Sequence, residues 1–84
     1  MGKNIKKGVI WRKIEGKIFI IDPEREKLHS LNETASFFWE LLADKKTAEE
    51  MTKKAASRYE AAPEEIRKDL SALLELLKKE KLLI

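Results

Sequence analysis

The chain holds few side chains that could carry out catalysis, and their spacing argues against it. His29 is the only histidine, and Ser30 follows it directly. In an extended segment neighbouring side chains point to opposite faces, so these two cannot work together as base and nucleophile. Glu65 and Asp69 share one helix face, but carboxylates at this spacing usually pair with lysine or arginine in solvent. Neither pair predicts a catalytic site.

Metal and cofactor chemistry are also poorly supported. With one histidine and no cysteine, the chain lacks the ligands of an ordinary zinc site. Its three glycines, Gly2, Gly8 and Gly16, do not form a phosphate-binding loop. We therefore expect no metal and no cofactor, and we expect that the chain is not an enzyme.

The length of 84 residues predicts a single domain over residues 1–84, with a flexible polar segment at residues 1–7. A domain of this size buries roughly 60–65% of its unfolded surface, enough for one modest core. The longest apolar run, Ile18 to Ile21, is too short to span a bilayer, and the N-terminus lacks the apolar region of a signal peptide. Together with the absence of cysteine, this favours a cytoplasmic protein without a membrane partner.

Charge is unevenly distributed along the chain. The net charge is +3, from 18 basic and 15 acidic residues. Residues 1–31 hold eight basic and four acidic side chains, whereas residues 63–84 hold five of each. The positive charge therefore belongs to the N-terminal part and not to the C-terminal part.

The N-terminal part predicts three short antiparallel strands. Gly8 to Ile14 and Lys17 to Asp22 are rich in Ile, Val, Phe and Trp, which favour strands. Glu15-Gly16 can close a tight hairpin between them, because glycine accepts a positive φ. Asp22-Pro23 is typical of a turn, and Lys27 to Leu31 then continues as a third strand.

Three helices are predicted after the strands. The first runs from about Glu33 to Ala43, with Asn32 as its N-cap. Thr47 and Glu50 form a capping box that begins a second helix, which ends near Tyr59. Pro63 suits the first turn of the third helix. A stripe typical of a buried helix face follows at Ile66, Leu70, Leu73, Leu74 and Leu77.

Apolar residues occupy both faces of the predicted sheet. Trp11 alternates with Ile10, and Phe19 and Ile21 alternate with Ile18 and Ile20. Either the third helix reaches around the edge of the sheet, or one apolar face awaits a partner. Aromatic residues so close to a small sheet usually belong to the core, and we assign there Phe37, Phe38 and Trp39.

This order of elements resembles the PqqD-like family, the small peptide chaperones of pyrroloquinoline-quinone biosynthesis. The family includes the recognition elements for ribosomally made, post-translationally modified peptides. The resemblance spans about residues 8–83 and is most specific in Asp22-Pro23-Glu24, in Leu28 to Ala35 and in Trp39 to Leu42. It implies an α+β fold like a winged helix-turn-helix, with a three-stranded antiparallel sheet followed by three helices. Two departures stand out, because the family often has glycine where this chain has Asp44-Lys45-Lys46 and Lys81.

The resemblance implies that the chain binds the leader segment of a precursor peptide. In this family the leader adds as a strand to the edge of the third strand and lies against the third helix, which is β-augmentation. Carried over to this sequence, the implied site comprises Lys27, Leu28, His29, Ser30, Leu31, Ile66, Arg67, Asp69, Leu70, Leu73 and Leu77. Basic Lys27 and Arg67 would favour an acidic leader. The implied partner enzyme is a radical S-adenosylmethionine enzyme or a leader peptidase.

Two other interpretations stay open from the sequence. A winged-helix transcription regulator would need a recognition helix dense in arginine and lysine, and the balanced charge of residues 63–84 argues against nucleic acid. The chain could also be an interaction domain detached from a larger modifying enzyme.

Overall fold

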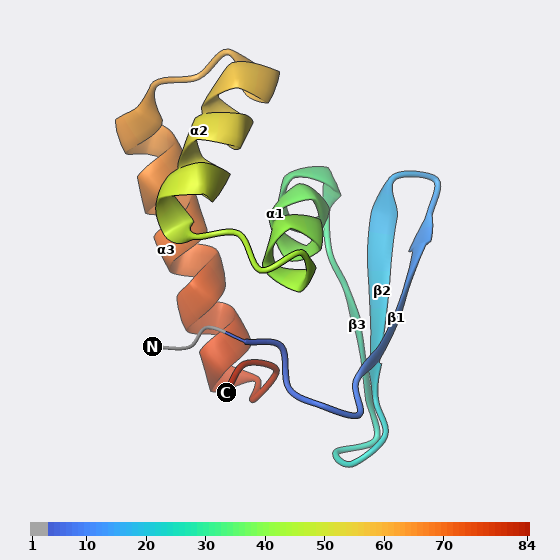
Figure 1. Ribbon diagram of the computed structural model, residues 1–84. Helices are drawn as coiled ribbons and strands as arrows, with labels where there is room; N and C mark the ends of the chain where they lie inside the picture. The colour runs from blue at the N-terminus through green and yellow to red at the C-terminus, as the bar shows by residue number, and fades with distance from the viewer. Residues whose placement is uncertain (1–3) are drawn as a thin grey trace.

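In the computed structural model, which describes residues 4–84, three antiparallel strands precede three helices (Figure 1). The elements are β1 Ile10–Ile14, β2 Lys17–Asp22, β3 Lys27–Ser30, α1 Glu33–Ala43, α2 Ala48–Tyr59 and α3 Pro63–Lys79. This architecture confirms the predicted α+β fold. The longest helix is α3, with 17 residues.

The sheet has the strand order β1-β2-β3, so β2 is central. Glu15 and Gly16 both have positive φ, 51° and 84°, as expected of a tight hairpin between β1 and β2. The β2–β3 turn is closed by a hydrogen bond from the Glu26 N–H to the Pro23 carbonyl, at 3.3 Å. The predicted strand bounds were wrong by one or two residues. β1 begins after Gly8, whose φ of 90° belongs to a turn, and β3 ends at Ser30.

The predicted caps of α1 and α2 are confirmed. Asn32 Oδ1 accepts a hydrogen bond from the Ala35 N–H at 2.8 Å. In the capping box of α2, the Thr47 N–H donates to Glu50 Oε1 at 2.8 Å and the Glu50 N–H donates to Thr47 Oγ1 at 3.1 Å. The hydrogen bond from the Thr47 backbone favours the charged carboxylate and thereby lowers the pKa of Glu50. α3 begins with Pro63 in its first turn and has no side-chain cap.

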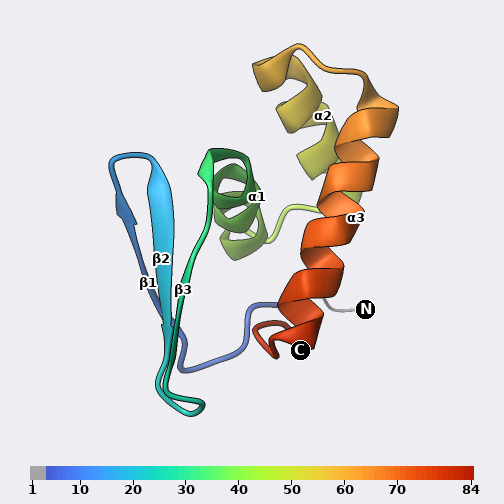
Figure 2. The same cartoon turned by 180° about the vertical axis from the view of Figure 1, so that it is seen from behind.

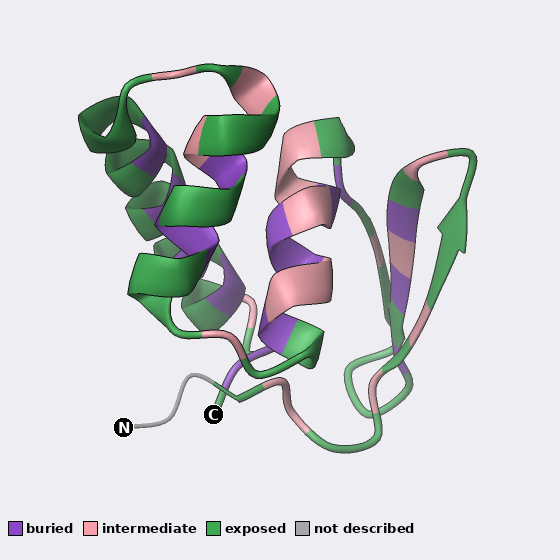
Figure 3. Cartoon of the chain, turned by 45° about the horizontal axis from the view of Figure 1, so that its top comes forward, coloured by how far each residue is buried: buried purple, intermediate pink, exposed green. Residues whose placement is uncertain are grey.

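The core lies where α1 packs between the sheet and the pair α2–α3, as the buried inner faces in Figure 3 show. Ile18 and Ile20 of β2 and Trp39 of α1 have no exposed surface. The predicted α3 stripe is wholly buried. Phe38 is also buried, but Phe37 is only half-buried, so its assignment to the interior was only partly right. Trp11 packs edge-on against Trp39, with ring centroids 6.3 Å apart.

The N-terminal segment pairs with the C-terminal tail. Ile5 and Leu83 form an isolated antiparallel bridge, and the Lys6 N–H donates to the Leu82 carbonyl at 2.9 Å. The Ile84 N–H donates to the Asn4 carbonyl at 2.9 Å. Residues 4–6 thus lie beside the C-terminal tail, and residues 1–3 of the segment expected to be flexible lie outside the described part of the chain.

A candidate peptide groove between β3 and α3

The strand β3 lies at one edge of the sheet, and both β3 and α3 lie toward the viewer in Figure 2. The Leu31 N–H donates to the Ile18 carbonyl at 2.9 Å, so the backbone of Leu31 is turned toward β2. Backbone groups alternate in direction along an antiparallel strand. His29 is therefore also turned toward β2, and Leu28 and Ser30 turn their N–H and C=O groups toward the open edge.

A cavity of about 450 Å³ lies where the end of β3 and the start of α1 meet α3. The apolar residues that line it are Leu31, Ala35, Phe38, Leu73 and Leu76. The polar ones are Ser30, Asn32, Thr34 and Asp69. The open backbone edge therefore runs toward a largely apolar cavity with a few polar groups, which is the usual composition of a ligand site.

Ser36, buried in α1, fixes the end of β3 beside this cavity. Its hydroxyl accepts a hydrogen bond from the Ile18 N–H at 2.7 Å and donates one to the Leu31 carbonyl at 3.2 Å. The hydroxyl thus stands between two backbone groups that an uninterrupted β2–β3 ladder would pair directly. The Ser36 side chain therefore links α1 to β2 and to Leu31, the residue that follows β3.

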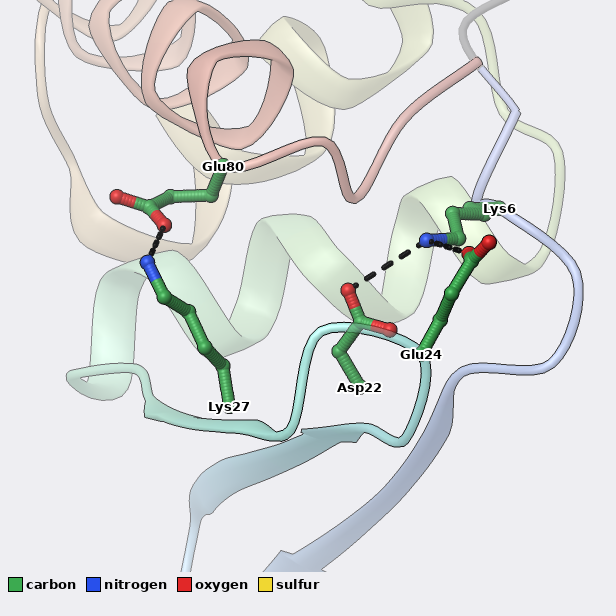
Figure 4. Close-up of polar contacts among 5 residues, drawn as sticks. All are labelled: Lys6, Asp22, Glu24, Lys27 and Glu80. Atoms are coloured by element: carbon green, nitrogen blue, oxygen red, sulfur yellow. Dashed lines mark hydrogen bonds and ion pairs between the residues drawn. The ribbon is translucent and has the colours of Figure 1, made fainter.

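Ion pairs lie at the start of β3 and beside the β2–β3 turn (Figure 4). Lys27 Nζ lies 3.5 Å from Glu80 Oε1, which links the start of β3 to the residue after α3. Lys6 Nζ lies 2.6 Å from Glu24 Oε1 and 3.5 Å from Asp22 Oδ2, across the β2–β3 turn. The hydrogen bond to Glu24, helped by the nearby Asp22 charge, raises the pKa of Lys6.

The structure brings together only some of the residues that the sequence suggested for the site. Four of them line the cavity: Ser30, Leu31, Asp69 and Leu73. Lys27, Leu28 and His29 lie on β3 itself. Ile66, Leu70 and Leu77 are buried in the core. Arg67 lies apart from the groove, because it lines a second cavity between α2 and α3.

Five lining residues were missed by the sequence reasoning: Asn32, Thr34, Ala35, Phe38 and Leu76. Leu76 carried a usable signal, since it follows Leu73 by three residues and Asp69 by seven. Asp69 and Leu76 lie on the same face of α3 as Leu73, which also belongs to the buried stripe. The lining residues in and just before α1 gave no such signal, because Asn32 and Phe38 were already explained as the helix cap and a core residue.

His29 and Ser30, the two residues considered as base and nucleophile, both lie on β3. Over residues 4–84, no three His, Asp or Glu side chains converge as they would around a metal ion. His29 is partly buried and Ser30 exposed, on opposite faces of β3. Across the same residues, no helix combines the length and the apolar character needed to cross a membrane.

Comparison with known proteins identifies the family. Residues 17–83 match the family model described as coenzyme PQQ synthesis protein D (PqqD). The chain belongs to the PqqD family. The family match begins within the β1–β2 hairpin and includes β3, the cavity and α3. No curated protein matches the chain.

Two solved structures share the fold of this PqqD-family chain. One is TbiB1 in complex with the TbiA(beta) leader peptide, with a TM-score of 0.92 and 22% identity over 95% of this chain and 93% of that chain. The other is lasso peptide synthetase B1 complexed with the leader peptide, with a TM-score of 0.88 and 18% identity over 96% of this chain and 95% of that chain. Neither comparison supports the DNA-binding alternative.

Proposed function

We propose that this chain binds the leader segment of a ribosomally made precursor peptide as an added strand along the open edge of β3. The observation that carries the proposal is the open backbone edge of β3 beside an apolar cavity. Membership of the PqqD family supports it. So do the two structural neighbours, both of which are complexes with a leader peptide.

The main-chain contacts follow from the register of β3. An antiparallel leader strand would exchange hydrogen bonds with Leu28 and Ser30, whose backbone groups face the open edge. His29 and Leu31 would keep their bonds to β2, so binding would cost no existing ladder bond. Affinity from main-chain bonds is insensitive to sequence, and this fits a recognition element that reads only a few side chains.

The cavity would supply the specificity. Alternate side chains of the added strand point to one face, so leader residues on the inner face would enter between β3 and α3. Leu73 and Leu76 would contact an apolar leader residue there. Because Arg67 is remote and Lys27 is paired with Glu80, the preference for an acidic leader is weaker than the sequence suggested. Asp69 would instead favour a basic leader residue at that end.

The bound leader would be presented to a partner enzyme that modifies or processes the precursor, such as a radical S-adenosylmethionine enzyme or a leader peptidase. In this proposal the chain contributes binding and orientation and no catalytic group.

The test replaces single edge residues with proline. Ser30→Pro removes an N–H that faces the open edge and leaves the β2–β3 ladder intact. We expect it to weaken binding of the fluorescently labelled cognate leader by about tenfold, since one good hydrogen bond is lost and the proline ring obstructs the edge. Leu76→Ser should also weaken leader binding, because it removes apolar surface from the cavity.

The matched controls separate binding from folding. His29→Pro removes a ladder N–H and should lower the free energy of unfolding, whereas Ser30→Pro should leave it nearly unchanged. A proline within α3 would break the helix, so the neutral surface control is Lys68→Ala, at an exposed position on α3. If Ser30→Pro binds the leader as tightly as the unmodified chain, the leader does not pair with β3.

A further inference from the structure

No helix within residues 4–84 packs against one face of the sheet. Side chains at alternate strand positions point away from α1, and the pairing register brings them into cross-strand rows. One row is Ile10, Ile21 and Leu28, and the next is Arg12, Phe19 and Ser30. We call this the outer face, completed by Ile14 and Lys17.

Four large apolar side chains of the outer face are exposed to water. The exposed fractions are 53% for Ile10, 52% for Ile14, 48% for Ile21 and 70% for Leu28. Single exposed apolar residues are ordinary, but a contiguous group of this size usually marks an interface. The sequence left two possibilities for this surface, and α3 does not reach it.

The charges on the outer face indicate what covers it. Among the strand residues that point outward, the only charged side chains are Arg12 and Lys17, and both are basic. Neither takes part in an ion pair within the described residues. A well-matched partner would therefore be an apolar surface that carries carboxylates opposite these two cations.

We infer that the outer face is the docking surface for the enzyme that acts on the precursor, and that this enzyme presents apolar residues flanked by carboxylates. This inference rests on the proposed function. The outer face is continuous with β3, because Leu28 belongs to both. An enzyme docked there would lie beside a leader strand added to β3, while the cavity on the inner side remained free for leader side chains.

Two other occupants fit the outer face less well. A two-fold dimer requires a self-complementary patch, whereas this one would bury Arg12 and Lys17 of both copies without any carboxylate from the face itself. A membrane surface would suit the combination of basic and apolar residues, but a single flat sheet face with two cations gives only weak attraction to anionic lipid. Both occupants are distinguishable in the test.

The test uses the full chain, its cognate precursor and the enzyme that modifies that precursor. The double variant Ile10→Thr/Ile14→Thr removes apolar surface from β1, far from the leader edge, and threonine keeps strand propensity. We expect enzyme affinity, measured by biolayer interferometry, to fall by at least about tenfold. Leader affinity should stay within about twofold. Arg12→Glu should weaken enzyme binding and reverse its salt dependence.

The controls carry the same chemical changes elsewhere. Ile84→Thr alters an apolar residue that is 67% exposed at the C-terminus, and Lys68→Glu reverses an exposed charge on α3. Both should bind the enzyme normally. Unchanged enzyme affinity in the double variant would overturn the inference.

Two further results would overturn it in favour of another occupant. One is sedimentation showing a dimer that the double variant abolishes. The other is binding of the chain to vesicles of phosphatidylcholine and phosphatidylserine that the double variant abolishes. If the unmodified chain binds the enzyme through this face but does not bind the leader, the proposed function fails and the docking surface stands.

Discussion

Replacing Ser36 with alanine should lower the free energy of unfolding by about 2 kcal/mol. The hydroxyl satisfies the Ile18 N–H at 2.7 Å, and Ile18 has no exposed surface, so that donor would be left buried without an acceptor. Such a loss costs about 1–3 kcal/mol. The longer bond to the Leu31 carbonyl, at 3.2 Å, adds about 0.5–1 kcal/mol. The better helix propensity of alanine returns about 0.5 kcal/mol.

Urea denaturation followed by circular dichroism measures this change in the free energy of unfolding. In a thermal melt, the melting temperature should fall by about 8–16 °C. Ser71→Ala is the matched control, since Ser71 is an exposed serine on α3 and its replacement should be neutral or slightly stabilising. Ser36→Ala should also loosen the end of β3 and weaken leader binding. A loss of stability below about 0.5 kcal/mol would show that Ser36 does not hold β2 and α1 together.

Three further predictions follow from the caps and the charge. Lys45 and Lys81 have φ of 60° and 62°, so replacing either with glycine should stabilise the chain by about 0.5–1 kcal/mol in urea, whereas Lys68→Gly in the middle of α3 should destabilise it. The hydrogen bond from Thr47 lowers the pKa of Glu50 below its usual 4.5, so the stability that its charge contributes is present above pH 4.5 and lost as the pH falls through the folded-state value. Melting curves of Glu50→Gln and the unmodified chain should therefore converge at acid pH; a constant difference would contradict this. Duplex DNA should bind more weakly than about 1 μM in gel shifts at physiological salt, and tight sequence-selective binding would contradict the charge argument.

Much of the fold could be predicted from the sequence because local signals agreed with tertiary packing. The capping box at Thr47, the Asn32 cap and the α3 stripe each have a short-range physical cause, and each is confirmed. The left-handed residues Lys45 and Lys81 lie where the family resemblance suggested glycine. Strand ends were less predictable, since the turn at Gly8 has no strong sequence signal.

The lining of the groove could be predicted only in part, because it depends on which face of α3 is directed toward β3 and which toward α2. The stripe from Ile66 to Leu77 is apolar at every position, and sequence alone does not say which members face the sheet. The structure places Leu73 at the cavity and Arg67 on the opposite side, near α2. The hydrogen bonds of Ser36 to Ile18 and Leu31 could not be predicted from the sequence, since a serine within a helix usually points to solvent or bonds its own turn.

The central claim is that a leader strand pairs with the open edge of β3, and amide hydrogen exchange tests it most directly. In the free chain, the amides of His29 and Leu31 should exchange slowly, because they donate to β2, while those of Leu28 and Ser30 should exchange fast. Addition of the cognate leader should slow exchange at Leu28 and Ser30 and shift the amide resonances of residues 27–31 first. If the leader binds while Leu28 and Ser30 still exchange as in the free chain, the leader is not held as a strand on β3.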